Sequence, residues 1–164
     1  MDTVEQETIS ATLTVHAPAE KVFAVLADPG THAAIDGTGW VRRPVDPAPL
    51  TGQGQVFRMA MHNPGHPDGD YETANKVHVL APPLAIGWMT GQERGEGEGD
   101  YAFGGWCWRY DLAPAGEDTT EVTLTYDWSA VPQEVRDGLP FPFPPFGPDH
   151  LPNSLRHLAE LLKG

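Results

Sequence analysis

Cysteine, positive charge and long apolar runs are scarce in this sequence. Cys107 is the only cysteine, which excludes an intrachain disulfide. Only 10 Lys and Arg face 23 Asp and Glu, and the formal charge of −13 opposes binding to phosphate backbones or anionic lipid. No apolar run approaches the roughly 20 residues that cross a bilayer. We therefore expect no nucleic-acid partner and no integral membrane association.

Basic and apolar residues are also missing from the beginning of the chain, Met-Asp-Thr-Val-Glu-Gln-Glu, where a signal peptide would carry both. We therefore expect a cytoplasmic protein. A chain of 164 residues can bury a core without disulfides or a structural metal. We expect residues 1–164 to form a single domain, either a monomer or a homodimer, that uses no cofactor.

The densest pattern in the sequence is a β-hairpin between Gly105 and Trp128. Large apolar residues alternate with polar ones on both sides of a Pro-Ala-Gly-Glu-Asp turn, as an antiparallel pair with one buried face requires. Pairing around Gly116 and Glu117 puts every large apolar side chain on the same face. These are Trp106, Trp108, Tyr110, Leu112, Val122, Leu124, Tyr126 and Trp128. A face with three Trp and two Tyr needs a helix, a ligand, or both packed against it.

Alternation also predicts strands elsewhere, and helical spacing of apolar residues predicts three helices. The predicted strands are residues 8–15, 40–43, 55–62, 71–80 and 84–90, and the strand 71–80 would turn Asn75, Val77 and Val79 inward. Two short helices are predicted at 18–28 and 30–35, and a third near the C-terminus. The apolar side of the third helix is Leu151, Leu155, Leu158 and Leu162. Antiparallel strands with segregated helices define an α+β fold, and the acidic, glycine-rich residues 92–100 predict a mobile loop.

Four motifs carry a resemblance to a known superfamily. They are Ala-Pro-Ala-Glu-Lys-Val-Phe-Ala-Val-Leu-Ala-Asp-Pro at 17–29, His-Ala-Ala-Ile-Asp-Gly-Thr-Gly at 32–39, Ala-Pro-Pro at 81–83 leading to Ile-Gly-Trp at 86–88, and Thr-Tyr-Asp-Trp at 125–128. With the order of elements, they make the chain resemble the START-like (SRPBCC, helix-grip, Bet v 1-like) superfamily, above all its polyketide cyclase/dehydrase-like branch. The resemblance implies a curved antiparallel sheet of about six or seven strands wrapped around a long C-terminal helix, with two short helices between strands one and two.

That fold would enclose a largely apolar cavity for a hydrophobic ligand. The residues expected to line it are Phe57, Met59, Met61, Asn75, Val77, Trp88, Trp106, Trp108, Tyr110, Tyr126, Trp128, Leu151, Leu155 and Leu158. For the aliphatic residues, ordinary core packing is the favoured interpretation. For the aromatic residues, packing and ligand binding have similar weight, because one helix cannot easily cover so many rings and because indole and phenol groups suit a flat ligand.

His32 and Asp36 are the candidate catalytic residues. They are four residues apart at the second short helix, so they share a face and could form an imidazole–carboxylate pair at the cavity mouth that acts as general acid or base. A solvated helix face is the favoured interpretation of this spacing. The amide of Asn75 and the hydroxyls of Tyr110 and Tyr126 are candidates to hold a ligand carbonyl, with structural hydrogen bonds as the alternative.

Metal binding and nucleophilic catalysis find little support. His62, His66, Asp68 and His78 are of metal-ligand type, but Asn-Pro-Gly separates the first two, so we expect no metal site. Cys107 falls on the outward face of the hairpin without a histidine at a telling spacing, which disfavours a nucleophilic role.

The leading functional interpretation is binding of a hydrophobic, polycyclic or aromatic small molecule in an internal cavity. If the protein is an enzyme, such a site would catalyse cyclisation or dehydration by positioning a folded substrate, as in a polyketide cyclase or dehydrase. The alternative is a non-catalytic carrier of a lipid or metabolite, or a protein that sequesters an antibiotic. A co-chaperone-like interaction module is a third alternative, but it calls for an exposed apolar patch. Resemblance of fold does not choose among them.

Overall fold

The computed structural model describes residues 8–36, 40–46, 48–62, 70–93, 101–138 and 149–162. Their strands are β1 (Thr8–Val15), β2 (Val41–Pro44), β3 (Val56–His62), β4 (Asp70–Ala81), β5 (Ala85–Glu93), β6 (Tyr101–Gly116) and β7 (Thr119–Asp127). Their helices are α1 (Ala19–Leu26), a 3-10 turn η1 (Pro29–Thr31), α2 (His32–Ile35), α3 (Gln133–Gly138) and α4 (His150–Leu161). The predicted strands and helices are therefore present in the predicted order, and α3 is an addition.

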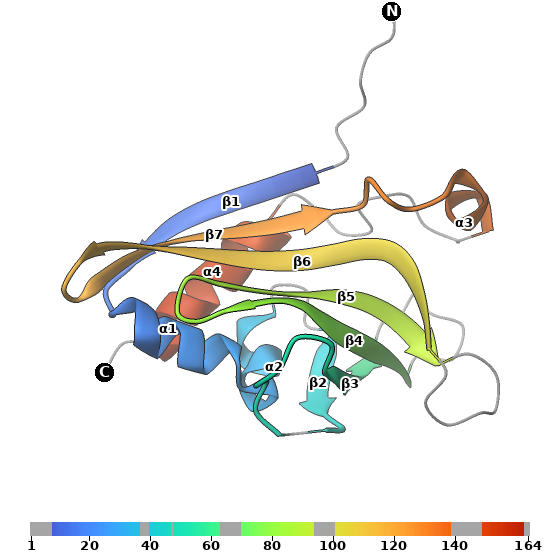
Figure 1. Ribbon diagram of the computed structural model, residues 1–164, viewed down its shortest axis with the longest axis horizontal. Helices are drawn as coiled ribbons and strands as arrows, with labels where there is room; N and C mark the ends of the chain where they lie inside the picture. Colours follow the sequence, from blue (N-terminus) through green and yellow to red (C-terminus); the bar gives the residue numbers. More distant parts are fainter. Residues whose placement is uncertain are drawn as a thin grey trace, which may run out of the picture.

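The seven strands form one antiparallel, curved sheet in the order β1-β7-β6-β5-β4-β3-β2, with α1, α2 and α4 on one side (Figure 1). The predicted hairpin register is confirmed: Leu112 pairs with Val122, and Trp108 pairs with Tyr126. Its buried and polar residues alternate as a one-sided strand pair requires. The sequence pattern therefore predicts both the α+β class and the central hairpin correctly.

The C-terminal helix α4 packs against β1, β7 and α2, while α1 packs on β5, β6 and β7 (Figure 1). We call the face of the sheet that these helices cover the inner face. The predicted leucine stripe of α4 is buried there, with Leu155 only 1% exposed. Burying one leucine contributes about 1.5–3 kcal/mol, so these leucines stabilise the packing of α4 against the sheet.

Register shifts interrupt the regular ladder in four of the strand pairs. The register of β4 shifts between Val77, which pairs with Trp88, and Val79, which pairs with Gly87. This bulge at His78 brings Leu80 rather than Val79 against the core, so the uniform alternation predicted for 71–80 is wrong after Val77. In β6, Gly105 has φ +104°, and a Cβ there would lie 2.5 Å from the carbonyl oxygen of Ala130.

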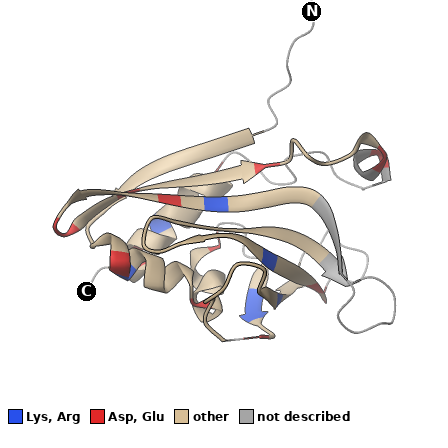
Figure 2. Cartoon of the chain, viewed as in Figure 1, with Lys and Arg blue, Asp and Glu red and all other residues tan. Residues whose placement is uncertain are grey.

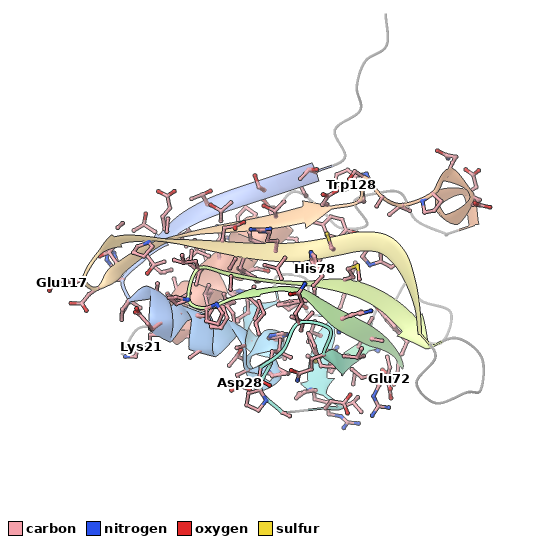
Figure 3. The ribbon with its side chains drawn as sticks, in the orientation of Figure 1. Lys21, Asp28, Glu72, His78, Glu117 and Trp128 are labelled. Carbon is pink, nitrogen blue, oxygen red and sulfur yellow. The ribbon has the colours of Figure 1, made fainter. Side chains whose placement is uncertain are left out.

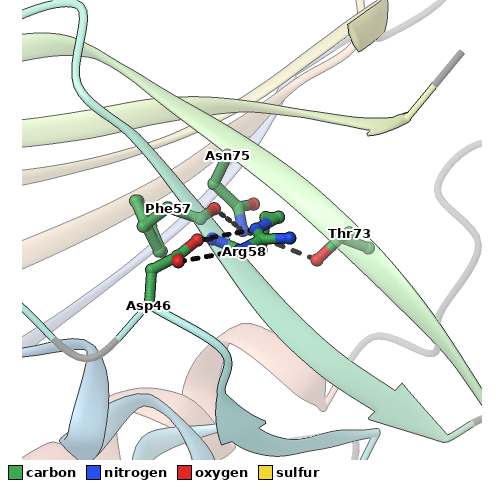
Figure 4. Close-up of polar contacts among 5 residues, drawn as sticks. All are labelled: Asp46, Phe57, Arg58, Thr73 and Asn75. Atoms are coloured by element: carbon green, nitrogen blue, oxygen red, sulfur yellow. Dashed lines mark hydrogen bonds and ion pairs between the residues drawn. The ribbon is translucent and has the colours of Figure 1, made fainter. Parts of the chain in front are cut away.

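The ends of β5 and β6 differ from the prediction, and an ion pair lies at the edge of β3. Strand β5 extends to Glu93 and β6 begins at Tyr101, so the loop predicted at 92–100 starts too early, and residues 94–100 lie outside the described residues. Arg58 of β3 forms a two-pronged ion pair with Asp46, with nitrogen–oxygen distances of 2.8 and 3.0 Å (Figure 4).

None of the helices in the described ranges has the length and apolarity that a bilayer crossing needs.

Candidate functional site

Strand register lines up one valine and three aromatic side chains across the inner face. Val77 on β4 pairs with Trp88 on β5, which pairs with Trp108 on β6, which pairs with Tyr126 on β7. Paired residues point to the same side of a sheet, so the four side chains form a continuous row. The rings of Trp108 and Tyr126 have centroids 4.5 Å apart. We call Trp88, Trp106 and Trp108 the tryptophan patch, since Trp106 precedes Trp108 by two residues on the same face.

The tryptophan patch is more exposed than the other predicted cavity residues, except Met61. Trp88, Trp106 and Trp108 pack against the core but remain half-buried, as does Met61 on β3. The other predicted cavity residues are buried: Phe57, Met59, Asn75, Val77, Tyr110, Tyr126, Trp128, Leu151, Leu155 and Leu158. Burial fits both tight packing and the lining of a closed cavity, so a role in ligand binding stays a prediction for these residues.

Asn75 lies in a polar row beside the aromatic one. Its amide nitrogen donates to the carbonyl of Phe57 at 3.3 Å and to the hydroxyl of Thr73 at 3.5 Å (Figure 4). The hydroxyl of Thr90 donates to its amide oxygen at 2.9 Å. The structure therefore favours the structural alternative for Asn75, since protein partners already use its amide.

His32 packs as an aromatic residue. Its ring stacks on Trp88 with centroids 5.0 Å apart and meets the edge of Phe57 at 5.6 Å. Its Nε2 donates to the carbonyl of Leu26 at 3.0 Å, which assigns the proton of the neutral ring to that nitrogen. Desolvation lowers the pKa of His32, although the hydrogen bond to Leu26 and the charge of Asp28 oppose the shift. At neutral pH His32 is therefore uncharged.

The carboxylate of Asp36 meets a different histidine. Its Oδ1 lies 3.9 Å from Nδ1 of His150, and both side chains are 8% exposed. The backbone N–H of Val41 donates to Oδ2 at 3.0 Å. His150 is the first residue of α4, where the helix dipole favours a negative charge, so the position suits the carboxylate of Asp36. The ring of His150 also meets Trp108 edge-on at 5.3 Å.

The Asp36–His150 pair sets the electrostatics next to the tryptophan patch. Burial lowers the pKa of His150, and the negative charge of Asp36 partly offsets that shift. Burial, and then the charge of Asp36, raises the pKa of the Tyr110 hydroxyl. Tyr110 is thus a neutral hydrogen-bond donor at physiological pH. A carboxylate, a neutral imidazole and a phenol therefore lie close to half-buried indoles.

Two helices carry this pair and are tied together. His157, seven residues after His150 on α4, uses Nδ1 to donate to the backbone carbonyls of Ile35 and Asp36 at 3.1 and 3.2 Å. Residues seven apart lie on the same side of a helix. The end of α2 is thus held along two turns of α4.

The predicted partnership of His32 and Asp36 is wrong. Both residues lie at the second short helix as predicted, but α2 ends at Ile35, and the carboxylate of Asp36 contacts His150 and Val41 instead. The sequence interpretation missed His150 as the imidazole partner. A signal existed, because His150, Ser154 and Leu158 are spaced by four and all three are buried.

The residues considered for metal binding or nucleophilic catalysis lie outside this region. His62 forms a 2.8 Å contact with Asp70, whereas His66 and Asp68 lie outside the described residues. The described residues contain no group of three or more His, Cys, Asp or Glu arranged to hold a metal ion. Burial and the nearby charge of Asp127 raise the pKa of Cys107, so its thiol is a weak nucleophile at neutral pH.

Comparison with known proteins gives relatives of similar fold. No family model matches the chain. The uncharacterized protein Rv0088 of Mycobacterium tuberculosis is 31% identical over 134 residues, which are 81% of this chain and 52% of that protein. The chain therefore spans about half the length of this curated relative.

Two solved structures cover nearly the whole chain. Protein NE0264 from Nitrosomonas europaea superposes with a TM-score of 0.66 and 14% identity, over 98% of this chain and 97% of that one. A START superfamily protein from Mycobacterium smegmatis superposes with a TM-score of 0.58 and 20% identity, over 96% and 94% of the two chains. At these identities the likeness concerns the fold alone.

Proposed function

We propose that this chain, which has the START-like helix-grip fold, binds a hydrophobic small molecule with an aromatic or polycyclic frame against the inner face of its sheet. One observation carries the proposal: Trp88, Trp106 and Trp108 lie on the covered side of the sheet and pack against the core, yet remain half-buried. Indole side chains that stay partly exposed on an otherwise covered face are suited to contact with a flat ligand.

Contact with the tryptophan patch would contribute favourable binding energy. A ligand that removes about 100 Å² of apolar indole surface from water gains about 2.5 kcal/mol from that surface alone. Each stacked ring pair adds about 0.5–1.5 kcal/mol. These gains offset part of the cost of association, and a rigid polycyclic frame keeps that cost low because it has few torsions to freeze.

Titration with 1-pyrenemethanol tests the proposal, with tryptophan emission and calorimetry as independent readouts. We expect saturable quenching of tryptophan emission, accompanied by pyrene emission from energy transfer, with a matching binding heat. Trp106→Leu and Trp108→Leu should each weaken binding about tenfold, since each removes a stacking face. The control variant is Leu84→Ala, because Leu84 is an exposed apolar residue in the turn before β5. This variant should bind the ligand like the wild type. Absence of both signals across a panel of polycyclic phenols and alcohols would refute ligand binding.

A second candidate function, acid–base catalysis on the bound ligand, is favoured by the Asp36–His150 pair. A buried imidazole beside a carboxylate is a common general base, because the carboxylate orients the ring and stabilises its protonated form. The cyclisation or dehydration chemistry of polyketide cyclases would use such a group near a positioned substrate. A carrier that binds without turnover is the alternative.

Separate measurement of turnover and affinity distinguishes the two. With a substrate that the wild type converts, His150→Gln and Asp36→Asn should lower kcat about 10²–10⁴-fold while KM changes by a few fold. His32→Gln tests in the same assay whether His32, the imidazole that sequence spacing favours, takes part in turnover. Tight binding with quantitative recovery of the unchanged ligand would instead identify a carrier or sequestering protein.

A further inference from the structure

We propose that the ligand is neutral or cationic where it reaches Asp36, and that the site rejects carboxylates and phosphates of the same hydrophobic frame. This inference rests on the proposed function and names its ligand class. It predicts phenols, alcohols or amines as ligands, and it excludes fatty acids and other anionic amphiphiles.

The negative charge of Asp36 lies next to the tryptophan patch. Its carboxylate is 3.9 Å from His150, and the ring of His150 touches Trp108 edge-on at 5.3 Å. With its side chain 8% exposed, Asp36 is shielded from water. Charges that are poorly solvated interact strongly over such distances, so a second anion beside Trp108 would be repelled.

The described Lys and Arg side chains lie mostly at the surface. The Lys and Arg side chains that the structure describes are Lys21, Arg42, Arg43, Arg58, Lys76, Arg109 and Arg156. All are exposed except Arg58, which is half-buried with its side chain 37% exposed and is already paired with Asp46. Figure 2 shows the same sparse distribution of Lys and Arg over the described chain, and Figure 3 shows the labelled Lys21 at the outside of α1. A ligand anion would therefore find no described basic partner inside.

The beginning of α4 does not rescue an anion either. Its helix dipole favours negative charge, but the carboxylate of Asp36 already lies there beside the first residue, His150. Protonation of His150 could supply a positive charge, yet burial lowers its pKa, so the ring is neutral at pH 7.5. A ligand that reaches His150 thus meets the negative charge of Asp36.

Neutral and cationic groups, by contrast, have suitable partners. A ligand hydroxyl or ammonium can donate to the Asp36 carboxylate, and charge-assisted bonds of this kind are stronger than neutral ones. The neutral Tyr110 hydroxyl, whose pKa is raised by burial and then by Asp36, can donate to a ligand carbonyl or ether. These groups select a head group, while the indoles select a flat frame.

Three probes that share one frame test the inference: 1-pyrenemethylamine, 1-pyrenemethanol and 1-pyrenecarboxylate, titrated at pH 7.5 in 0.15 M and 0.5 M salt. We expect the carboxylate to bind at least tenfold more weakly than the alcohol, and the amine at least as tightly. The preference should persist at 0.5 M salt, because salt screens exposed charges far more than buried ones. A carboxylate that binds as tightly as the alcohol overturns the inference and leaves the binding function intact. Failure of all three probes to bind overturns both.

A pair of variants assigns the effect to Asp36. Asp36→Asn and Glu72→Gln each remove one negative charge, but Glu72 is exposed on β4. Asp36→Asn should bring the carboxylate to within about threefold of the alcohol, whereas Glu72→Gln should keep the wild-type preference. Equal behaviour of the two variants would show that net charge, not Asp36, repels the anion, and would overturn the assignment. Thermal melting checks that each variant is folded. The comparison of the three probes on the wild-type protein does not depend on the variants.

Discussion

The carboxylate of Asp36 lies 3.9 Å from Nδ1 of His150, and this contact joins the end of α2 to the beginning of α4. The same carboxylate accepts a hydrogen bond from the N–H of Val41 in β2. One side chain therefore links three elements at the margin of the tryptophan patch. Its replacement should affect both the stability of the fold and the choice of ligand.

The first prediction concerns the two roles of this carboxylate. Asp36→Ala should lower the free energy of unfolding by about 1–3 kcal/mol, because the Val41 N–H loses a part-buried acceptor. Asp36→Asn keeps an oxygen acceptor and should lose less. Urea denaturation of both variants measures the difference. An equal loss in the two variants would mean that the charge rather than the hydrogen bond stabilises this corner.

The C-terminal helix should be essential for stability through its buried side only. Leu155→Ala should lower the free energy of unfolding by about 2–5 kcal/mol, since Leu155 is 1% exposed. Leu161→Ala on the same helix should change it by about 0.5 kcal/mol or less, because Leu161 is 44% exposed. Both values come from denaturant unfolding. Similar losses at the two positions would show that the sheet does not grip α4 by its leucine stripe.

Gly105 should tolerate no side chain. A Cβ at this position would lie 2.5 Å from the carbonyl oxygen of Ala130, and the positive φ of +104° disfavours an L residue. Gly105→Ala should therefore destabilise the protein by at least about 1–3 kcal/mol. Gly52→Ala is the matched control, because nothing lies within 4 Å of the place that its added methyl group would occupy. Thermal melting of Gly105→Ala that equals the wild type would contradict the close approach.

Stability should decline as the pH falls below about 6.5. Burial lowers the pKa of His32, His78 and His150 from the ordinary 6.5. Below that pH the unfolded chain binds more protons than the folded one, so acidification favours unfolding. Above that pH these histidines are neutral in both states, so they no longer lower the stability. The urea midpoint should therefore be constant from pH 8 to 7 and fall from pH 6.5 to 5.

A histidine variant separates this effect from the titration of carboxylates. His32→Gln should flatten the decline between pH 6.5 and 5, because it removes one of the three groups. His16→Gln, at an exposed position, should leave the decline unchanged. A decline that is the same in all three proteins would assign the pH dependence to other groups.

Local periodicity predicts most of the fold. The register of the Trp108–Tyr126 pair and the buried leucines of α4 both follow from repeats of two or about four residues. The bulge at His78 was not predictable in this way, because Val79 and Leu80 are both apolar and either could face inward. Alternation therefore gives the correct strand but not the side chain that reaches the core.

The candidate site was only partly predictable, for a different reason. Asp36 and His150 belong to distant segments, and only the packing of α2 on α4 brings them together. His32 and Asp36 are neighbours in sequence, yet the ring of His32 stacks on Trp88 of another element instead. Spacing along one helix predicts which residues of that helix can contact each other. It does not predict contacts with residues of distant segments.

Two-dimensional NMR of the tryptophan indole N–H groups during titration with 1-pyrenemethanol tests the central claim most directly. Assignment by single Trp→Phe variants identifies the signals of Trp88, Trp106 and Trp108. We expect these three signals to shift together and to saturate with one ligand per chain. Signals that stay unchanged at saturating ligand, or shifts confined to other tryptophans, would contradict binding at the tryptophan patch.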